Sequence, residues 1–318
     1  MQKGYLILVL LAGALQVTAR QQLPDSSHEK LHTAIAGFQA KQHCPGLAVA
    51  IVKDDKLIFS HAEAPVTIDT RFPIMSVTKP FVATMLLQLA EQGRLSIHDR
   101  VSKYVPEYKV RSNYSGHVAT TLFQLATHTS GLPRNTPSDI TLAQSYDRWR
   151  LTAGKEAIQS FSTEQQLLHD LQYIYLDYPA FDYGERHYSN LGYSVLGIAL
   201  QRAAKTGFAD YVINHICQPL QMTNTGFLPD TNIAKGYRYN NGSYIQLPDF
   251  KPNSALYSGG MYSTARDLCK FISFQYEQKA SAILSIESRA MMHLLGIGCR
   301  TAHSYLIHEG ALPGYRCI

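Results

Sequence analysis

The chain has 318 residues, of which 45% are hydrophobic and 17% charged, the composition of a folded globular protein rather than a disordered one. Its formal net charge is +5 without any run of basic residues, so the sequence gives little support to nucleic-acid binding. The length suits one large domain or two closely packed ones.

The first element along the chain is an apolar segment with the features of a secretory leader. Lys3 provides a positive start, Tyr5 to Leu15 are apolar throughout, and Val17-Thr18-Ala19 ends in a small residue of the cleavage type. The apolar stretch is short for a membrane span. We therefore expect residues 1–19 to be a signal peptide, with a periplasmic or secreted location and no stable membrane span after cleavage. An uncleaved N-terminal anchor is the alternative.

Beyond the leader, the expected elements run from helix to strands, then helices, then strands again. In chain order they are a helix over 27–39, a strand hairpin over 46–60, helices over 76–91 and 191–204, strands around 236–239 and 243–247, helices over 265–276 and 286–295, and a final strand over 304–308. This order predicts an α/β (α+β) fold in a single domain over 20–318. An antiparallel sheet comes from both chain ends (about 25–118 and 235–318), flanked by helices, and a mostly helical region over about 119–234 is inserted.

Ser76 and Lys79 lie three residues apart at the start of an apolar helix-like segment. Residues i and i+3 share a helix face, which brings the Ser76 hydroxyl and the Lys79 amine within hydrogen-bond reach. A serine hydroxyl needs a neighbouring base to become a nucleophile, and a lysine can be that base when burial and nearby positive charge lower its pKa. Because both residue types are common on surfaces, the isolated pattern also fits a solvated helix start.

A second pattern, Tyr188-Ser189-Asn190, stands just before the helix expected from Leu191. A tyrosine beside an ammonium group can be stabilised as phenolate and act as a general base or proton relay. Asn190 can donate to a substrate carbonyl and accept from Lys79. The alternative is a half-buried aromatic residue followed by an asparagine that caps the helix.

A third pattern, His308-Glu309-Gly310, stands on the expected final strand. The glycine would let a substrate backbone approach closely. The histidine would be a hydrogen-bond donor or a titratable neighbour of the hydroxyl pair. A histidine on a strand is otherwise more often structural.

Neither the cysteines nor the histidines form a recognisable ligand set. The thirteen histidines are scattered, and the five cysteines have no CxxC pair, so we expect no metal and no cofactor. An oxidising compartment would permit disulfides, but an odd number leaves at least one thiol unpaired. We expect most of the cysteines to be small buried residues: Cys44, Cys217, Cys269, Cys299 and Cys317.

Taken in order, Ser76-x-x-Lys79, Tyr188-x-Asn190 and His308-x-Gly310 resemble the motifs of the serine β-lactamase and penicillin-binding protein superfamily. The resemblance is strongest to the class C β-lactamase and related-esterase branch, and it covers about residues 25 to 318. The further segments that carry it are 69–79, 93–106, 125–132, 219–225 and 258–268.

The resemblance implies a role for each motif residue. Ser76 would attack a carbonyl and form an acyl-enzyme that water then hydrolyses, while Lys79 and Tyr188 share the proton transfers, with the choice of base left open. Asn190 and His308 would contact the substrate. The oxyanion would be held by the backbone N–H groups of Ser76 and of Ala311, the residue after Gly310.

Two departures from the family pattern modify this expectation. Members with strong β-lactamase activity usually have lysine where this chain has His308, so we expect ester or D-peptide hydrolysis, with slow β-lactam turnover. Relatives also continue beyond this strand with further strand and a helix, so we expect the end at Ile318 to leave a sheet edge exposed.

Two functions from different classes follow. The first is a secreted serine acyl-hydrolase acting on a small-molecule or peptide substrate, of which cell-wall peptides are one class. The second is a catalytically silent homologue that binds cell-wall or other peptides at the same site. A Ser-His-Asp hydrolase has little support, because the chain has no Gly-x-Ser-x-Gly elbow. The substrate, the disulfide pairing and the oligomeric state are open from sequence.

Overall fold

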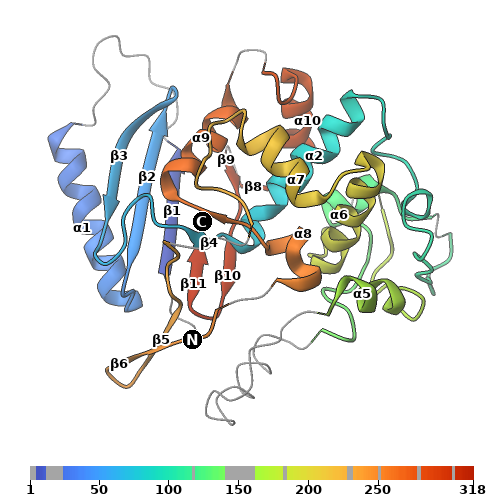
Figure 1. The fold of residues 1–318 in the computed structure, drawn as a ribbon, viewed down its shortest axis with the longest axis horizontal. Helices are drawn as coiled ribbons and strands as arrows, with labels where there is room; N and C mark the ends of the chain where they lie inside the picture. Colours follow the sequence, from blue (N-terminus) through green and yellow to red (C-terminus); the bar gives the residue numbers. More distant parts are fainter. Residues whose placement is uncertain are drawn as a thin grey trace.

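The computed structural model describes residues 5–11, 24–116, 119–139, 162–181, 185–227, 232–249, 252–277, 281–302 and 305–318. Figure 1 shows a sheet covered by helices on both faces, with a group of helices to one side. The expected α/β architecture, with a sheet assembled from both chain ends, is confirmed.

The main sheet has five described strands in the order β10–β11–β1–β2–β3. Their bounds are Tyr5–Leu11 for β1, Leu47–Lys53 for β2, Lys56–Ala62 for β3, Gly310–Leu312 for β10 and Tyr315–Cys317 for β11. The pairs β2–β3 and β10–β11 are antiparallel hairpins, as expected. Strand β1 is parallel to both of its neighbours, β2 and β11, so the sheet is not antiparallel throughout.

Strand β1 comes from the segment that we expected to be a leader. Its backbone pairs with β2 over six residues and with β11 over three. It therefore covers the edge of β11 that we expected to be exposed, and β10 is the edge strand on this side of the sheet. Cleavage after Ala19 stays a prediction.

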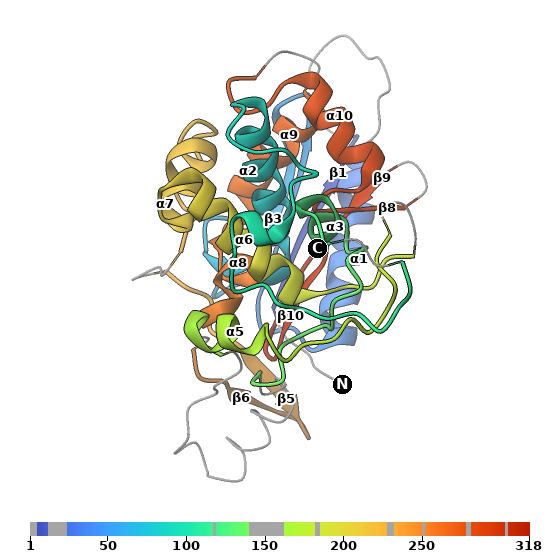
Figure 2. The same cartoon turned by 90° about the vertical axis from the view of Figure 1, so that its right-hand side faces the viewer.

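Side chains of β2 alternate between two cores. Leu47, Val49 and Ile51 face helix α1 (Asp25–Gln42), while Ala48, Ala50 and Val52 face the larger core. This period of two is the property of a strand with both faces covered. Figure 1 shows α1 on the opposite side of the sheet from the helical group, which faces the viewer in Figure 2.

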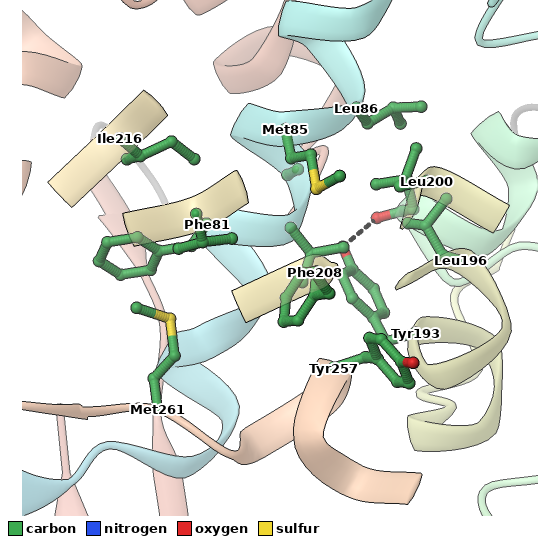
Figure 3. Close-up of a cluster of buried hydrophobic side chains, with 14 of the residues drawn as sticks. Phe81, Met85, Leu86, Tyr193, Leu196, Leu200, Phe208, Ile216, Tyr257 and Met261 are labelled. Atoms are coloured by element: carbon green, nitrogen blue, oxygen red, sulfur yellow. Dashed lines mark hydrogen bonds between the residues drawn. The ribbon is translucent and has the colours of Figure 1, made fainter. Parts of the chain in front are cut away.

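The helical group forms the larger core. It contains α2 (Lys79–Glu91), α3 (Leu122–Thr127), α5 (Glu164–Asp170), α6 (Asn190–Ala204), α7 (Phe208–Val212) and a π-helical turn over Ile213–Cys217. Figure 3 shows Met85 and Leu86 of α2 toward Leu196 and Leu200 of α6, with Tyr193, Phe208 and Tyr257 beside them. The first two motifs lie at the starts of α2 and α6. The close packing of large buried side chains between these helices fixes their relative position, and so the relative position of the two motifs.

The remaining elements connect the group to the sheet. They are β4 (Phe72–Pro73) paired with β7 (Tyr262–Ser263), the hairpin of β5 (Tyr237–Asn240) and β6 (Ser243–Gln246), α8 (Leu256–Gly259), α9 (Ala265–Tyr276), α10 (Ile286–Leu295), and β8 (Arg300–Ala302) paired with β9 (Tyr305–Ile307). Short 3-10 turns occur at Met75–Thr78, Val101–Lys103 and Asn253–Ala255.

The strand predicted over 304–308 is present as β9, but it is not the final strand and it does not include His308. Strand β9 ends at Ile307, His308 lies in the link that follows, and Gly310 begins a separate strand, β10. The chain then turns at Pro313-Gly314, where Gly314 has a φ of 88°, and continues as β11. A proline followed by a glycine at positive φ is a tight-turn signal that creates a hairpin from very few residues.

None of the described helices has the length and apolar character that a membrane crossing needs. None of the five cysteines, all within the described residues, forms a disulfide bond, and four of them are buried, in agreement with the expectation of small core residues. Cys299 is partly buried.

Candidate active site

Ser76 lies in the 3-10 turn Met75–Thr78, which leads directly into α2. The turn is held from both sides, because β4 pairs with β7 just before it and the Ile74 N–H donates to the Met261 carbonyl at 3.0 Å. Met75 has a φ of 46°, an uncommon conformation for a residue with a side chain. A residue stays in this uncommon backbone conformation only where the surrounding structure holds it there. Met75 directly precedes Ser76, whose side chain is half-exposed.

Lys79 is fully buried below this serine. Its Nζ lies 3.1 Å from Ser76 Oγ, 3.0 Å from Asn190 Oδ1 and 2.7 Å from the Ser258 carbonyl oxygen. The helical spacing that predicted the Ser76–Lys79 contact is therefore present, and an asparagine from α6 and a carbonyl from α8 complete the environment of the amine.

The environment of Lys79 favours its neutral form. Burial lowers the pKa of Lys79 well below its ordinary value, and the positive charge of Arg134 lowers it further. A neutral amine has two N–H groups and one lone pair. Two hydrogen bonds to Asn190 Oδ1 and the Ser258 carbonyl use both hydrogens, which leaves the lone pair directed at the Ser76 hydroxyl. In this state Lys79 can accept the proton of Ser76.

Tyr188 contacts Ser76 from the other side. Its hydroxyl donates to Ser76 Oγ at 2.7 Å. Burial raises the pKa of Tyr188 to about 12, even though the bond to Ser76 and the charge of Arg134 act in the opposite direction. The residue is thus a phenol near neutral pH, so the geometry favours a proton donor over the phenolate base considered from the sequence.

Asn190 is the first residue of α6, and Ser189 rather than Asn190 caps that helix, accepting from the Gly192 N–H at 2.9 Å. The Asn190 side chain is therefore free for the site. Its Oδ1 accepts from Lys79, and its Nδ2 donates to Asn135 Oδ1 at 3.1 Å. The Asn190 backbone N–H donates to the Arg134 carbonyl, so the segment 134–135 and the start of α6 form one unit.

Gly310, the last residue of the third motif, begins β10 and lies against the backbone next to Ser76. A Cβ at Gly310 would lie 2.3 Å from the Ile74 carbonyl oxygen, so only glycine permits this approach of β10 to the Ser76 turn. In a two-residue hairpin the flanking pair, Leu312 and Tyr315, exchanges hydrogen bonds, so Ala311 directs its N–H away from β11. This direction is toward the outer edge of β10, the edge strand of the described sheet, and β10 approaches the Ser76 turn at Gly310.

His308 stands in the link before β10 and is half-buried. Its Nδ1 lies 3.1 Å from the Glu309 carbonyl oxygen. Burial lowers the pKa of His308 to about 3, with a further contribution from the charge of Lys79. His308 is therefore a neutral group near neutral pH, unlike a lysine at the same position.

Four residues near the nucleophile were not identified from the sequence: Asn135, Arg134, Ser258 and His128. The guanidinium of Arg134 lies 4.9 Å from the centre of the Tyr188 ring. Asn135 and Arg134 follow the loop 125–132 that matched the family, and this proximity was the only available signal. Ser258 contributes a backbone carbonyl, which has no signature in a sequence. Among the described residues, no group of three side chains has the arrangement of a metal site.

The family comparison covers most of the chain. A family model described as Beta-lactamase matches residues 31–298. The chain is 35% identical over 215 residues to Beta-lactamase-like protein 2 of Dictyostelium discoideum, a match that covers 66% of this chain and 36% of that protein. It is 30% identical over 268 residues to Protein flp of Staphylococcus aureus (strain MRSA252), covering 80% and 50%. The chain thus spans half or less of the length of these curated relatives.

Solved structures share the fold. The octameric penicillin-binding protein homologue from Pyrococcus abyssi superposes with a TM-score of 0.69 at 24% identity, covering 91% of this chain and 64% of that one. A beta-lactamase/D-alanine carboxypeptidase from Yersinia pestis superposes with a TM-score of 0.57 at 25% identity, covering 72% and 62%.

Proposed function

Because the chain belongs to the Beta-lactamase family of serine hydrolases, we propose that it is a serine acyl-hydrolase that acts through an acyl-enzyme on Ser76. One observation carries the proposal. Ser76 Oγ lies 3.1 Å from a buried lysine amine and 2.7 Å from a partly buried phenol, so a base and an acid contact the same nucleophile.

Each group has one task in the proposed reaction. Neutral Lys79 takes the proton as Ser76 Oγ attacks the substrate carbonyl carbon, and the backbone N–H groups of Ser76 and Ala311 stabilise the oxyanion. Tyr188 donates its proton to the leaving group as the tetrahedral intermediate collapses. In the second half, the Tyr188 phenolate takes a proton from a water molecule as that water attacks the ester carbonyl carbon. When the second tetrahedral intermediate collapses, the Lys79 ammonium returns its proton to Ser76 Oγ, which regenerates the serine, the neutral amine and the phenol.

The neutral state of His308 bears on the substrate. Without a permanent cation at this position, the site offers less attraction to a carboxylate such as that of a β-lactam. We therefore place esters and small peptides ahead of β-lactams as substrates. The name of the Yersinia pestis protein includes both D-alanine carboxypeptidase and β-lactamase, which makes a D-peptide the second class to assay.

The test compares two chromogenic substrates on purified protein and adds a covalent label. Hydrolysis of a p-nitrophenyl ester at a higher kcat/KM than nitrocefin, together with labelling by a fluorophosphonate or a fluorescent penicillin, is the expected result. Folded protein that neither hydrolyses nor becomes labelled would instead support the silent peptide-binding function.

Replacing His308 with lysine is expected to shift the substrate preference toward β-lactams. A charge-assisted hydrogen bond is worth about 1.5–3 kcal/mol, so kcat/KM for nitrocefin should rise about 10-fold or more relative to p-nitrophenyl acetate. Steady-state kinetics with both substrates measure this ratio, and His308→Gln, which adds no charge, is the matched control. An equal change for both substrates would show that the charge at position 308 does not select the substrate.

The pH profile should report the protonation of Lys79. Hydrolysis needs the neutral amine, so kcat/KM should fall as the pH drops through the lowered pKa of Lys79. Arg134→Gln removes a nearby positive charge, which raises that pKa and moves the acid limb to higher pH. Because Arg134 is exposed, we expect a shift below about one pH unit that shrinks with added salt. Lys56→Gln removes an exposed charge at the first residue of β3 and should leave the acid limb in place. An acid limb that does not move in Arg134→Gln would refute the coupling.

A further inference from the structure

Histidine 128 lies next to the catalytic cluster, but no motif function explains it. We propose that His128 is a positioning residue for Tyr188, fixing the backbone on both sides of the phenol that contacts Ser76. The inference rests on the proposed function, since it assigns the group that places the proton donor of that reaction.

His128 is placed by the end of a short, well-defined helix. Helix α3 begins with a reciprocal capping box between Thr121 and Gln124 and ends at His128, which has a φ of 62°. In this left-handed conformation the chain reverses direction directly after the helix. The carbonyl and the imidazole of His128 then both contact the segment 187–189.

The two amide groups flanking Tyr188 bond to this one residue. The His187 N–H donates to the His128 carbonyl at 2.8 Å, and the Ser189 N–H donates to His128 Nδ1 at 3.2 Å. The Ser189 hydroxyl adds a bond to the Pro133 carbonyl at 2.6 Å. Tyr188 is therefore the residue between two anchored peptide groups, which restricts the direction of its side chain.

The imidazole also packs against the ring that it positions. Its centre lies 4.5 Å from the centre of the Tyr188 ring and 4.9 Å from that of Tyr193. Tyr193 is fully buried in α6 and donates to the Ala126 carbonyl in α3 at 2.6 Å. The imidazole thus contacts a fixed ring on one side and the catalytic ring on the other.

A single protonation state of His128 is compatible with these contacts. Nδ1 can accept from the Ser189 N–H only if it carries no proton, so the neutral ring has its proton on Nε2. Burial lowers the pKa of His128 well below its ordinary value, and the nearby charges of Arg186 and Arg134 act in the same direction. The acceptor is therefore present throughout the neutral range.

Positioning matters here because a misplacement of about 1 Å can cost about 100-fold in rate. The decisive experiment is a double-mutant cycle with Tyr188→Phe. His128→Leu should lower kcat for a p-nitrophenyl ester by about 10- to 100-fold with little change in KM. In a Tyr188→Phe background the same substitution should cost less than about 3-fold, because the phenol it positions is gone.

The matched variant is His128→Asn, whose side-chain oxygen can accept from the Ser189 N–H and which tolerates the left-handed conformation. It should recover most of the lost kcat. Equal losses with and without the Tyr188 hydroxyl, or no recovery with asparagine, would overturn the proposal. Should His128→Leu fail to fold, the cycle is run with His128→Asn, whose smaller kcat deficit must likewise vanish without the Tyr188 hydroxyl.

A readout independent of turnover separates this inference from the proposed function. In a crystal structure of His128→Leu or of His128→Asn, we expect the Tyr188 hydroxyl to be displaced from Ser76 Oγ in proportion to the loss of kcat. An unchanged distance in both variants overturns the positioning role even if the enzyme is active. A wild-type protein without Ser76-dependent hydrolysis overturns the proposed function, while the distance still decides the role of His128.

Discussion

Ser76→Ala is expected to abolish covalent labelling and to lower kcat by about 10⁴- to 10⁶-fold for any ester that the protein hydrolyses. The reason is that no other described hydroxyl has both the Lys79 amine and the Tyr188 phenol as partners. Without Ser76 Oγ, the base and the acid remain but no acyl-enzyme can form. Active-site titration with a fluorophosphonate and steady-state kinetics measure the two effects.

Controls for this prediction come from the same chain. Ser60→Ala removes an exposed hydroxyl on β3 and should leave labelling and kcat unchanged. Thermal unfolding of Ser76→Ala should match that of wild type, because Ser76 is half-exposed and alanine fits the turn. Labelling that persists in Ser76→Ala would move the nucleophile to another residue.

Lys79→Met is expected to lower kcat by about 10²- to 10⁴-fold while the protein still folds. Methionine fills a similar volume in this fully buried position but has no lone pair basic enough to accept the Ser76 proton. Stability should stay within about 2 kcal/mol of wild type, since the cost of two unsatisfied acceptors, Asn190 Oδ1 and the Ser258 carbonyl, is offset by removal of a buried amine. Enzyme kinetics and thermal unfolding together test this expectation.

Lys79→Arg gives the contrasting result and excludes a purely structural role. Arginine keeps its charge at any working pH, so it should be as inactive as Lys79→Met. It should also be several kcal/mol less stable, because a larger and permanently charged group must enter a dry site. Substantial activity in Lys79→Met would contradict the assignment of Lys79 as base.

The local parts of the site were predictable from sequence. Three-residue spacing alone predicted the contact between Ser76 and Lys79, because helix geometry fixes it. The partner Asn190 is 111 positions away, and only the resemblance to a family connected the two, a resemblance that the family match confirms. The roles of Ser258 and His128 in holding Lys79 and Tyr188 depend on backbone groups and chain reversals, which leave no pattern in residue types.

The error at the end of the chain has a physical explanation. The apolar residues near 304–308 predicted a strand, but the pattern of apolar residues does not say with which strand it pairs. In the structure β9 pairs with β8 and not with the main sheet. Gly310 allows β10 to pass the Ile74 carbonyl, while its use for substrate approach stays a prediction. The helices were easier, as in α6 and α9, because their apolar spacing is local.

The position of β1 has a consequence for how this chain assembles. Strand β1 separates the hairpin β2–β3 from the hairpin β10–β11, and the latter contains Ala311. The same seven residues cannot be both a discarded leader and this central strand in one molecule. A molecule without them has a gap one strand wide, with ladder edges on both sides. Loss of these residues would therefore leave the hydrogen-bonding groups of β2 and β11 that face β1 without partners, and it would separate the hairpin that contains Ala311 from β2.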